Sequence, residues 1–237
     1  MFIDSYFNYQ QAITYEHLYT MKTLEYMRRL GLQGYIIVFS YASEKIPLLT
    51  QVCGIACSIG LNSFGIIFLS REILYNPKIS SELKEFIIAH EVAHIVRSHT
   101  INRILIRTLF TILLQLFFMS IENLVRSKKP LETLLYLITI VMQVLGMVQT
   151  IKIDINVIKM QELEADAIAT YLTGCRVAQR FLEWLSTLYK SGVFISHVAV
   201  LGLPALTMEE RINNIKLLCL EQPYVYFYIS LLSVHSQ

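Results

Sequence analysis

Two histidines and a glutamate interrupt an otherwise apolar run in the stretch IIAHEVAHIV, residues 87–96. His90 and His94 are four residues apart, so on a helix their rings lie on one face and can bind one metal ion. Glu91 is rotated off that line, which suits a general base that contacts the attacking water. The alternative is that backbone or water satisfies these groups, but burying unpaired polar groups is costly. The pattern HExxH therefore predicts a catalytic zinc site.

A second polar segment supplies a candidate third ligand. A catalytic zinc site takes three protein ligands and leaves one position open. In QELEADA, residues 161–167, Glu162 and Asp166 share one face of a predicted helix. We expect Glu162 to bind the metal and Asp166 to accept a hydrogen bond from the outer nitrogen of a liganding histidine. The alternative is an ordinary acidic helix surface.

The elements that position these residues are two long helices. We expect the helix carrying HExxH to run to Val125, turn at RSKKP, and a second helix to return from Leu131. His94 lies 34 residues before Lys128, and Glu162 lies 33 residues after Lys129. At about 1.5 Å of rise per residue the two ligands come level across the hairpin.

The composition points to a membrane. Apolar residues make up 54% of the chain and charged residues only 16%, against about 25% charged in ordinary soluble domains. The uncharged stretches are Thr108–Ile121, with 14 residues, and Thr133–Ile151, with 19; a span needs roughly 20. A single crossing would separate the two halves of the site, so the hairpin crosses twice or not at all. A re-entrant or protein-packed hairpin is the alternative.

Other bulk features limit location and partners. The net charge of +2 is too mild to indicate nucleic acid binding. The N-terminus lacks the features of a signal peptide, so we expect an integral membrane protein with its catalytic site on the cytoplasmic side. The four cysteines lie in apolar surroundings and are expected to be free buried thiols.

The remaining segments predict an α+β fold that is mainly α, within a single domain spanning 1–237. An amphipathic helix is expected at 12–30 and helices again from 174 onward. Three short runs predict a small antiparallel sheet. They are YIIVFSY at 35–41, VCGIACS at 52–58 and FGIIFLS at 64–70. His99, in an exposed-looking RSHT, is expected to take no part in catalysis.

The order HEVAH, hydrophobic hairpin, QELEADAIATYLTG and MEERINNIKLL resembles the HtpX and CAAX-prenyl-protease family of integral-membrane zinc metallopeptidases, a group of gluzincins. The resemblance extends from about residue 35 to 218. It implies one Zn²⁺ held by His90, His94 and Glu162, with Glu91 as general base and Asp166 supporting a ligand. It also implies a polypeptide substrate and contact with membrane lipid.

The same resemblance bears on substrate binding and on the transition state. GLNSFGIIFLSREIL, residues 60–74, resembles the family's strand whose edge binds substrate as an added β-strand. This assigns the substrate edge to Gly65, Ile66, Ile67 and Phe68. The family usually has a histidine and proline before a C-terminal arginine. Here Arg211 is kept and is the candidate oxyanion stabiliser, whereas Ala205 stands where histidine is expected. Tyr171, Tyr189 and His197 are alternatives for that role.

These features predict a zinc endopeptidase that hydrolyses membrane or membrane-proximal proteins, with a role in protein quality control. Two alternatives stay open. One is a prenyl-CAAX processing protease, and the other is an inactive membrane-associated scaffold that retains the motif.

Overall fold

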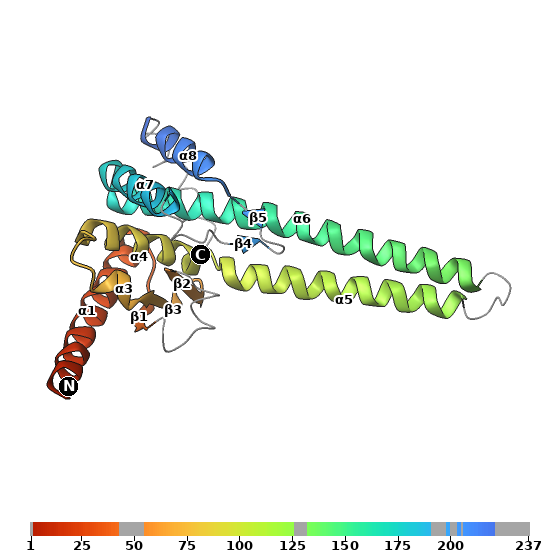
Figure 1. Ribbon diagram of the computed structural model, residues 1–237, viewed down its shortest axis with the longest axis horizontal. Helices are drawn as coiled ribbons and strands as arrows, with labels where there is room; N and C mark the ends of the chain where they lie inside the picture. Colours follow the sequence, from red (N-terminus) through yellow and green to blue (C-terminus); the bar gives the residue numbers. More distant parts are fainter. Residues whose placement is uncertain are drawn as a thin grey trace.

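The computed structural model describes residues 2–42, 55–125, 132–190, 198–199, 203–204 and 206–220. A globular end carries the sheet and the shorter helices, and a long helical hairpin extends from it (Figure 1). The α+β, mainly α class is confirmed. The elements are α1 (Phe2–Arg29), β1 (Tyr35–Tyr41), β2 (Ala56–Leu61), β3 (Phe64–Ser70), α3 (Arg71–Leu74), α4 (Ser81–Val96), α5 (His99–Val125), α6 (Glu132–Thr173), α7 (Cys175–Lys190), β4 (Val198–Ala199), β5 (Leu203–Pro204) and α8 (Met208–Leu220).

The main sheet is mixed rather than antiparallel. Its order is β1-β3-β2; β2 and β3 pair antiparallel, but β1 and β3 pair parallel. The expected antiparallel pairing is therefore wrong for β1. A two-residue turn in which Asn62 adopts a φ of 55° joins β2 to β3, so β3 enters the sheet beside β1 and β2 lies outside it. Alternation in a sequence predicts strands and their buried faces, but it does not predict which strands are neighbours.

This strand order corrects the predicted substrate edge. Residues 65–68 lie in β3, which pairs with a strand on each side. Gly65, Ile66, Ile67 and Phe68 therefore belong to the central strand, whose main-chain groups already bond within the sheet. An added strand needs unpaired main-chain groups, so the assignment of the substrate edge to these four residues is wrong.

Helix α1 covers the outer edge of β1 with side chains. Three side chains on one face of α1, those of Glu16, Thr20 and Thr23, form hydrogen bonds with the main chain of alternate β1 residues. The bonds are Ser40 N to Glu16 Oε1 (2.7 Å), Val38 N to Thr20 Oγ1 (3.0 Å) and Thr23 Oγ1 to Ile36 O (2.8 Å). Because α1 bonds to the edge of β1, β2 is the more open edge of the sheet among the described strands, although Thr100 Oγ1 of α5 donates to Ser58 O on it at 3.0 Å.

The helix that carries HExxH is anchored at its start and lies close to the sheet. Ser80 caps α4 by accepting a hydrogen bond from Leu83 N at 3.3 Å. Near its end, Ile95 packs against the paired glycines Gly60 and Gly65. A Cβ on either glycine would lie 2.8 Å from an Ile95 methyl carbon. The two glycines therefore allow α4 to approach the backbone of β2 and β3.

The expected continuous helix from α4 to Val125 is broken. Helix α4 ends at Val96, Ser98 adopts a φ of 53°, and α5 begins at His99. This left-handed conformation is uncommon for a residue with a side chain, and hydrogen bonds hold it here. Ser98 Oγ accepts from Asn62 N at 2.9 Å and donates to Asn62 Oδ1 at 3.1 Å. The break is thus fixed to the turn between β2 and β3.

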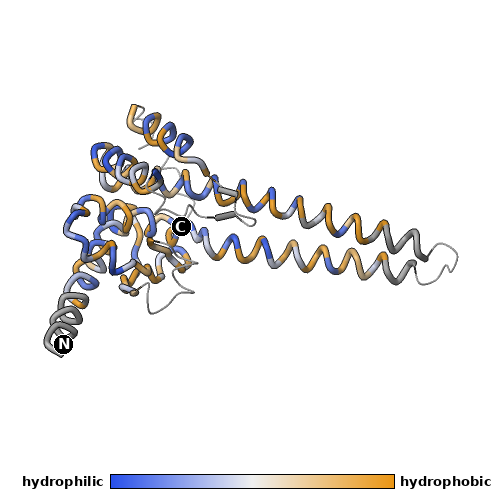
Figure 2. The backbone as a smooth tube through the Cα atoms, in the orientation of Figure 1, coloured by the Kyte–Doolittle hydropathy of each residue, from blue (hydrophilic) through white to orange (hydrophobic). Residues whose placement is uncertain are grey.

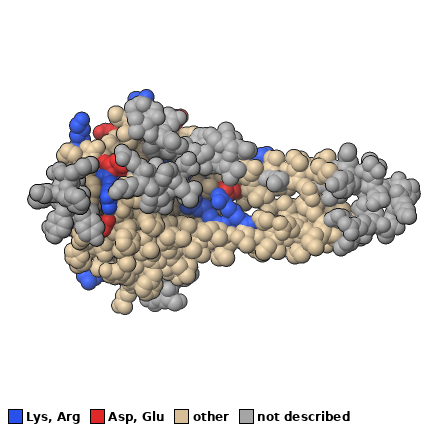
Figure 3. Space-filling view, turned by 60° about the horizontal axis from the view of Figure 1, so that its bottom comes forward, with Lys and Arg blue, Asp and Glu red and all other residues tan. Residues whose placement is uncertain are grey.

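The hairpin formed by α5 and α6 consists largely of hydrophobic residues (Figure 2). Many of its large apolar side chains are exposed. Its candidate spans are His99–Ile121, with 23 residues, and Ile140–Thr173, with 34. Both reach the length of roughly 20 residues that a bilayer requires, and within the most apolar 18-residue window of each only 6% of the residues are buried inside the protein. Charged side chains gather toward the globular end, whereas the face of the hairpin seen in Figure 3 is largely uncharged. The hairpin therefore indicates membrane association.

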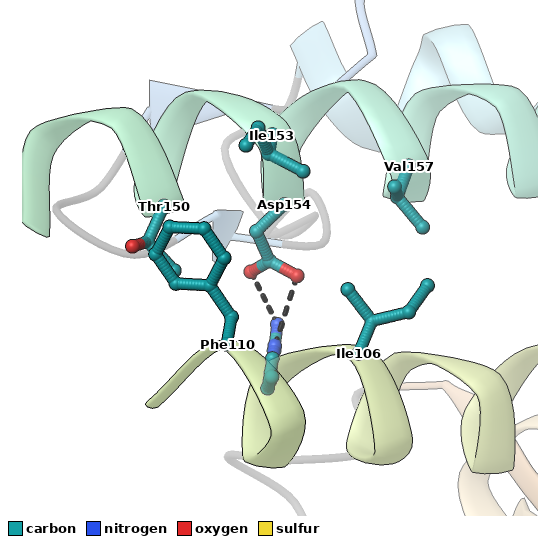
Figure 4. A pocket seen from close by; sticks show the side chains of 7 residues that line it. Ile106, Phe110, Thr150, Ile153, Asp154 and Val157 are labelled. Carbon is teal, nitrogen blue, oxygen red and sulfur yellow. Dashed lines mark hydrogen bonds and ion pairs between the residues drawn. The ribbon is translucent and has the colours of Figure 1, made fainter. Parts of the chain in front are cut away.

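One ion pair crosses the hairpin near its base. Arg107 of α5 donates to both carboxylate oxygens of Asp154 on α6, with Nε 2.9 Å from Oδ1 (Figure 4). The surrounding side chains are largely apolar and come from both helices: Ile106, Phe110, Thr150, Ile153 and Val157. Because a lone charge in an apolar environment is expensive, the pair neutralises both groups and sets how the two helices face each other.

A disulfide joins the beginning of α7 to the end of α8. Cys175 and Cys219 are bonded, with Cα atoms 5.6 Å apart, and Cys57 is disulfide-bonded too. The expectation of free thiols is therefore wrong for these three, and Cys53 lies outside the described residues. A separation of 44 residues leaves no local sequence signal of the pair in α7 and α8. Only the antiparallel packing of those helices brings its two thiols together.

We expect the variant with Cys175→Ala and Cys219→Ala to unfold more easily, because the disulfide restricts the unfolded chain. For a closed loop of this length the loss is about 4 kcal/mol in the free energy of unfolding. Denaturant titration in detergent, followed by the fluorescence of Trp184 on α7, measures it. Oxidised wild type, which keeps both this disulfide and the bond at Cys57, is the matched control. Equal midpoints for oxidised wild type and the double variant would contradict the disulfide.

Candidate metal centre

The structure brings His90 and His94 of α4 together with Glu162 of α6. One ligand atom from each lies within 4.8 Å of the others, and all three residues are buried. The two Nε2 atoms are 3.1 Å apart. Glu162 places Oε2 3.3 Å from His90 Nε2 and Oε1 3.4 Å from His94 Nε2. The residue count across the hairpin predicted this meeting, even though the helix is broken after α4.

These distances fit a bound metal ion. Zinc ligands lie about 2.0 to 2.1 Å from the ion in a tetrahedral arrangement, which separates neighbouring ligand atoms by roughly 3.3 Å. The three measured separations are close to that value. Two imidazoles and one carboxylate are also a usual donor set for catalytic zinc. The residues present therefore fit the ion that the sequence predicts.

Asp166 fixes the ring of His90. Its Oδ1 lies 3.0 Å from His90 Nδ1, a contact that favours a proton on that nitrogen and leaves Nε2 facing Glu162 and His94. Burial lowers the pKa of His90, but the carboxylates of Asp166 and Glu162 outweigh it and raise that pKa to about 10. The side chain of Asp166 thus lies where it was predicted to support a ligand.

Arg211 of α8 contacts Asp166 rather than an open position beside the ligands. Its Nε and Nη2 donate to the two carboxylate oxygens at 2.8 and 2.6 Å, and both residues are buried. Burial opposes the charge, but Asp166 raises the pKa of Arg211 above its usual value. This geometry favours holding Asp166 over stabilising an oxyanion. Among the alternatives, Tyr171 lies on α6, whereas the Tyr189 side chain, His197 and Ala205 lie outside the described residues.

His99 is buried beside the ligand His94, whereas the sequence suggested an exposed position. It is only 3% exposed, and its Nδ1 lies 2.8 Å from His94 Nδ1. Its Nε2 lies 3.0 Å from Oε2 of Glu164, whose other oxygen accepts from Arg97 Nε at 2.7 Å. On a continuous helix, positions 94 and 99 would face different directions. The break at Ser98 turns the His99 ring back toward α4, and no feature of the RSHT segment predicted it.

The expected general base is held by the open strand. Ser58 of β2 donates a hydrogen bond from Oγ to Glu91 Oε2 at 2.7 Å, and both residues are buried. The sequence analysis did not single out Ser58, because one serine in a short apolar strand carries no signal of its own. The bond fixes Glu91 beside the strand and orients its carboxylate.

Comparison with known families agrees with this geometry. The family model described as peptidase family M48 matches residues 55–197, which is more than half of the chain. The chain belongs to peptidase family M48. The metal-centre residues of α4 and α6 all lie inside the matched range. The resemblance to the HtpX and CAAX-prenyl-protease family is confirmed, and the chain is a member of a metallopeptidase family.

A solved structure has a similar fold. The crystal structure of S. mikatae Ste24p aligns with a TM-score of 0.52 at 17% sequence identity. The alignment covers 83% of this chain and 49% of that one, so the chain spans about half the length of Ste24p. A search among curated proteins finds no match.

We expect Arg211→Met to destabilise the protein strongly. It removes the partner of a buried carboxylate, and breaking a buried ion pair costs about 3 to 5 kcal/mol in the free energy of unfolding. The matched control is Lys159→Met, which removes the partner of Glu210 at the surface and is expected to cost about 1 kcal/mol or less. Chemical unfolding of both variants measures the difference. Equal losses would mean that Arg211 does not neutralise Asp166.

Proposed function

We propose that this M48 chain is a zinc-dependent endopeptidase that cleaves membrane or membrane-proximal polypeptides in protein quality control. The convergence of His90 and His94 with Glu162 across the hairpin carries the proposal. The spacing of the three donor atoms, the buried positions and the held outer nitrogens all favour a metal centre over unrelated polar side chains.

The chain's own residues supply the proton transfers and the orientation of the groups. A zinc ion bound by His90, His94 and Glu162 would polarise the scissile carbonyl and lower the pKa of a bound water to about 7. Glu91 takes a proton from the attacking water and passes it to the departing amine. Ser58 keeps the Glu91 carboxylate in one orientation during both transfers. Asp166 keeps the proton of His90 on Nδ1, away from the ligand atoms.

The open edge of β2 is the surface that we assign to substrate binding. The other edge of the sheet is closed by α1, and β2 carries Ser58, which contacts the general base. A polypeptide that adds to β2 as a further strand would run beside Glu91. Pairing through the main chain makes few demands on side chains, so it suits a protease that accepts many sequences.

The hairpin places this reaction near a membrane. Helix α5 begins five residues after the ligand His94, and its candidate span begins at the same residue. Polypeptides in or beside the bilayer are therefore the proposed substrates. A disulfide such as Cys175–Cys219 is typical of oxidising compartments and argues against a cytoplasmic location. The cytoplasmic orientation expected from the sequence stays a prediction.

We expect Glu91→Gln to abolish cleavage while zinc stays bound, because the amide keeps the size of the side chain but cannot accept the proton. Loss of a general base typically lowers the rate by about 100- to 10,000-fold. Cleavage of a membrane-tethered reporter in proteoliposomes, with metal analysis of the same sample, measures both effects.

The matched control is Glu85→Gln on the same helix, whose carboxylate contacts Tyr26 and Lys22 instead of the site. It should leave cleavage unchanged. Chelation should remove activity, and added zinc should restore it. Zinc binding with no cleavage of tethered or soluble polypeptides would favour the inactive scaffold. Cleavage that requires a prenyl group would favour the CAAX processing protease.

We expect Ser58→Ala to lower kcat by about 10-fold or more, because hydrogen bonds to charged groups contribute about 1.5 to 3 kcal/mol. KM and zinc content should stay unchanged. Steady-state kinetics on the reporter separate kcat from KM. Ser120→Ala, which removes a hydroxyl that donates to Leu116 O within α5, is the control. An unchanged kcat would show that Glu91 needs no support from β2.

A further inference from the structure

The two histidine ligands have different outer partners. His90 Nδ1 faces the carboxylate of Asp166 directly, at 3.0 Å. His94 Nδ1 faces a second imidazole, that of His99, at 2.8 Å. His99 in turn meets a carboxylate, with its Nε2 3.0 Å from Glu164 Oε2. His90 thus contacts a carboxylate directly, whereas the ring of His99 lies between His94 and its carboxylate.

The metal centre determines where the protons lie in the series of contacts from His94 through His99 to Glu164. A ligand histidine must present an unprotonated nitrogen to the ion, so His94 Nε2 is bare and its proton lies on Nδ1. That N–H donates to His99 Nδ1, which must then be the unprotonated nitrogen of its own ring. The remaining His99 proton lies on Nε2 and is donated to Glu164. Each of the three groups has one arrangement that satisfies its neighbours.

We infer that His99, backed by Glu164, is a positioning residue for His94 and sets the affinity of the site for zinc. This inference rests on the proposed metal centre. Outer-nitrogen partners fix the ring orientation and tautomer of a metal ligand, and their loss typically weakens metal binding by about 10- to 100-fold. His99 does so from α5, the first helix of the hairpin, and Glu164 from α6, the second.

Neighbouring residues hold the series of contacts from His94 to Glu164 in place at both ends. Ser98 is fixed to the β2–β3 turn by its bonds to Asn62, which determines where the His99 ring points. Glu164 lies two residues after the ligand Glu162 on α6, and its second oxygen is held by Arg97. The His99 ring is buried between them. Because His99 lies on α5 and Glu164 on α6, the affinity for zinc would depend on how the hairpin packs against the globular end.

The test compares two replacements of His99. His99→Phe keeps an aromatic ring of similar size but removes the nitrogen that accepts from His94. His99→Asn keeps an acceptor at nearly the same place, because its Oδ1 replaces Nδ1. We expect His99→Phe to raise the dissociation constant for zinc by about 10- to 100-fold and His99→Asn to restore most of the affinity. Glu164→Gln should fall between them, because it weakens the hydrogen bond from His99.

The measurements are zinc affinity by chelator competition and the visible spectrum of the Co²⁺-substituted protein, which reports ligand geometry directly. His17→Phe on the exposed face of α1 is the control. Unchanged zinc affinity in His99→Phe overturns the inference, and so does equal weakening by Phe and Asn, which would indicate packing alone. If His99→Phe does not fold, wild-type affinity and spectrum in Glu164→Gln overturn it instead. Failure of the wild type itself to bind zinc would overturn the proposed function.

Discussion

A carboxylate with no exposed surface, that of Asp166, is the group on which the site's architecture depends. A buried charge persists only when it is paired and hydrogen-bonded, and here its partners come from two other helices. Arg211 of α8 neutralises it, and His90 of α4 contacts it from the ligand side. The requirement to satisfy one charge therefore holds α4, α6 and α8 in a single arrangement. The disulfide between α7 and α8 keeps the helix that carries Arg211 beside its neighbour.

The break between α4 and α5 joins the parts of the molecule that must act together. Four consecutive residues, 97–100, each bond to a different element. Arg97 donates to Glu164 on α6, Ser98 bonds Asn62 in the β2–β3 turn, His99 meets His94 on α4, and Thr100 donates to Ser58 O on β2 at 3.0 Å. The hairpin, the ligand helix and the open strand therefore share one junction. A displacement of α5 would be felt at the ligands and at the strand together.

Much of this was predictable from local patterns, and the exceptions have physical reasons. Short runs of β-branched and aromatic residues predicted the bounds of β1 and β3, and the apolar runs on either side of RSKKP predicted the hairpin that brings Glu162 to the histidines. The order of strands was not predictable, because a sequence does not show that α1 closes one edge. The turn at Ser98 was also hidden, since neither glycine nor proline marks it and its stability comes from Asn62, far along the chain. The burial of His99 against His94 follows from that turn and was missed with it.

The position of the break also sets the distance between the metal centre and the apolar part of the hairpin. The candidate span of α5 starts at His99, beside the ligands, so the metal centre and the boundary of the apolar surface are separated by a fixed length of folded chain. On the proposed function, a polypeptide bound along β2 would lie at that level. Selection of the bond to be cut would then depend on how far it stands from the bilayer, with the sequence around it counting for less. On the proposed function, the hairpin would set the distance from the bilayer at which a polypeptide is cleaved.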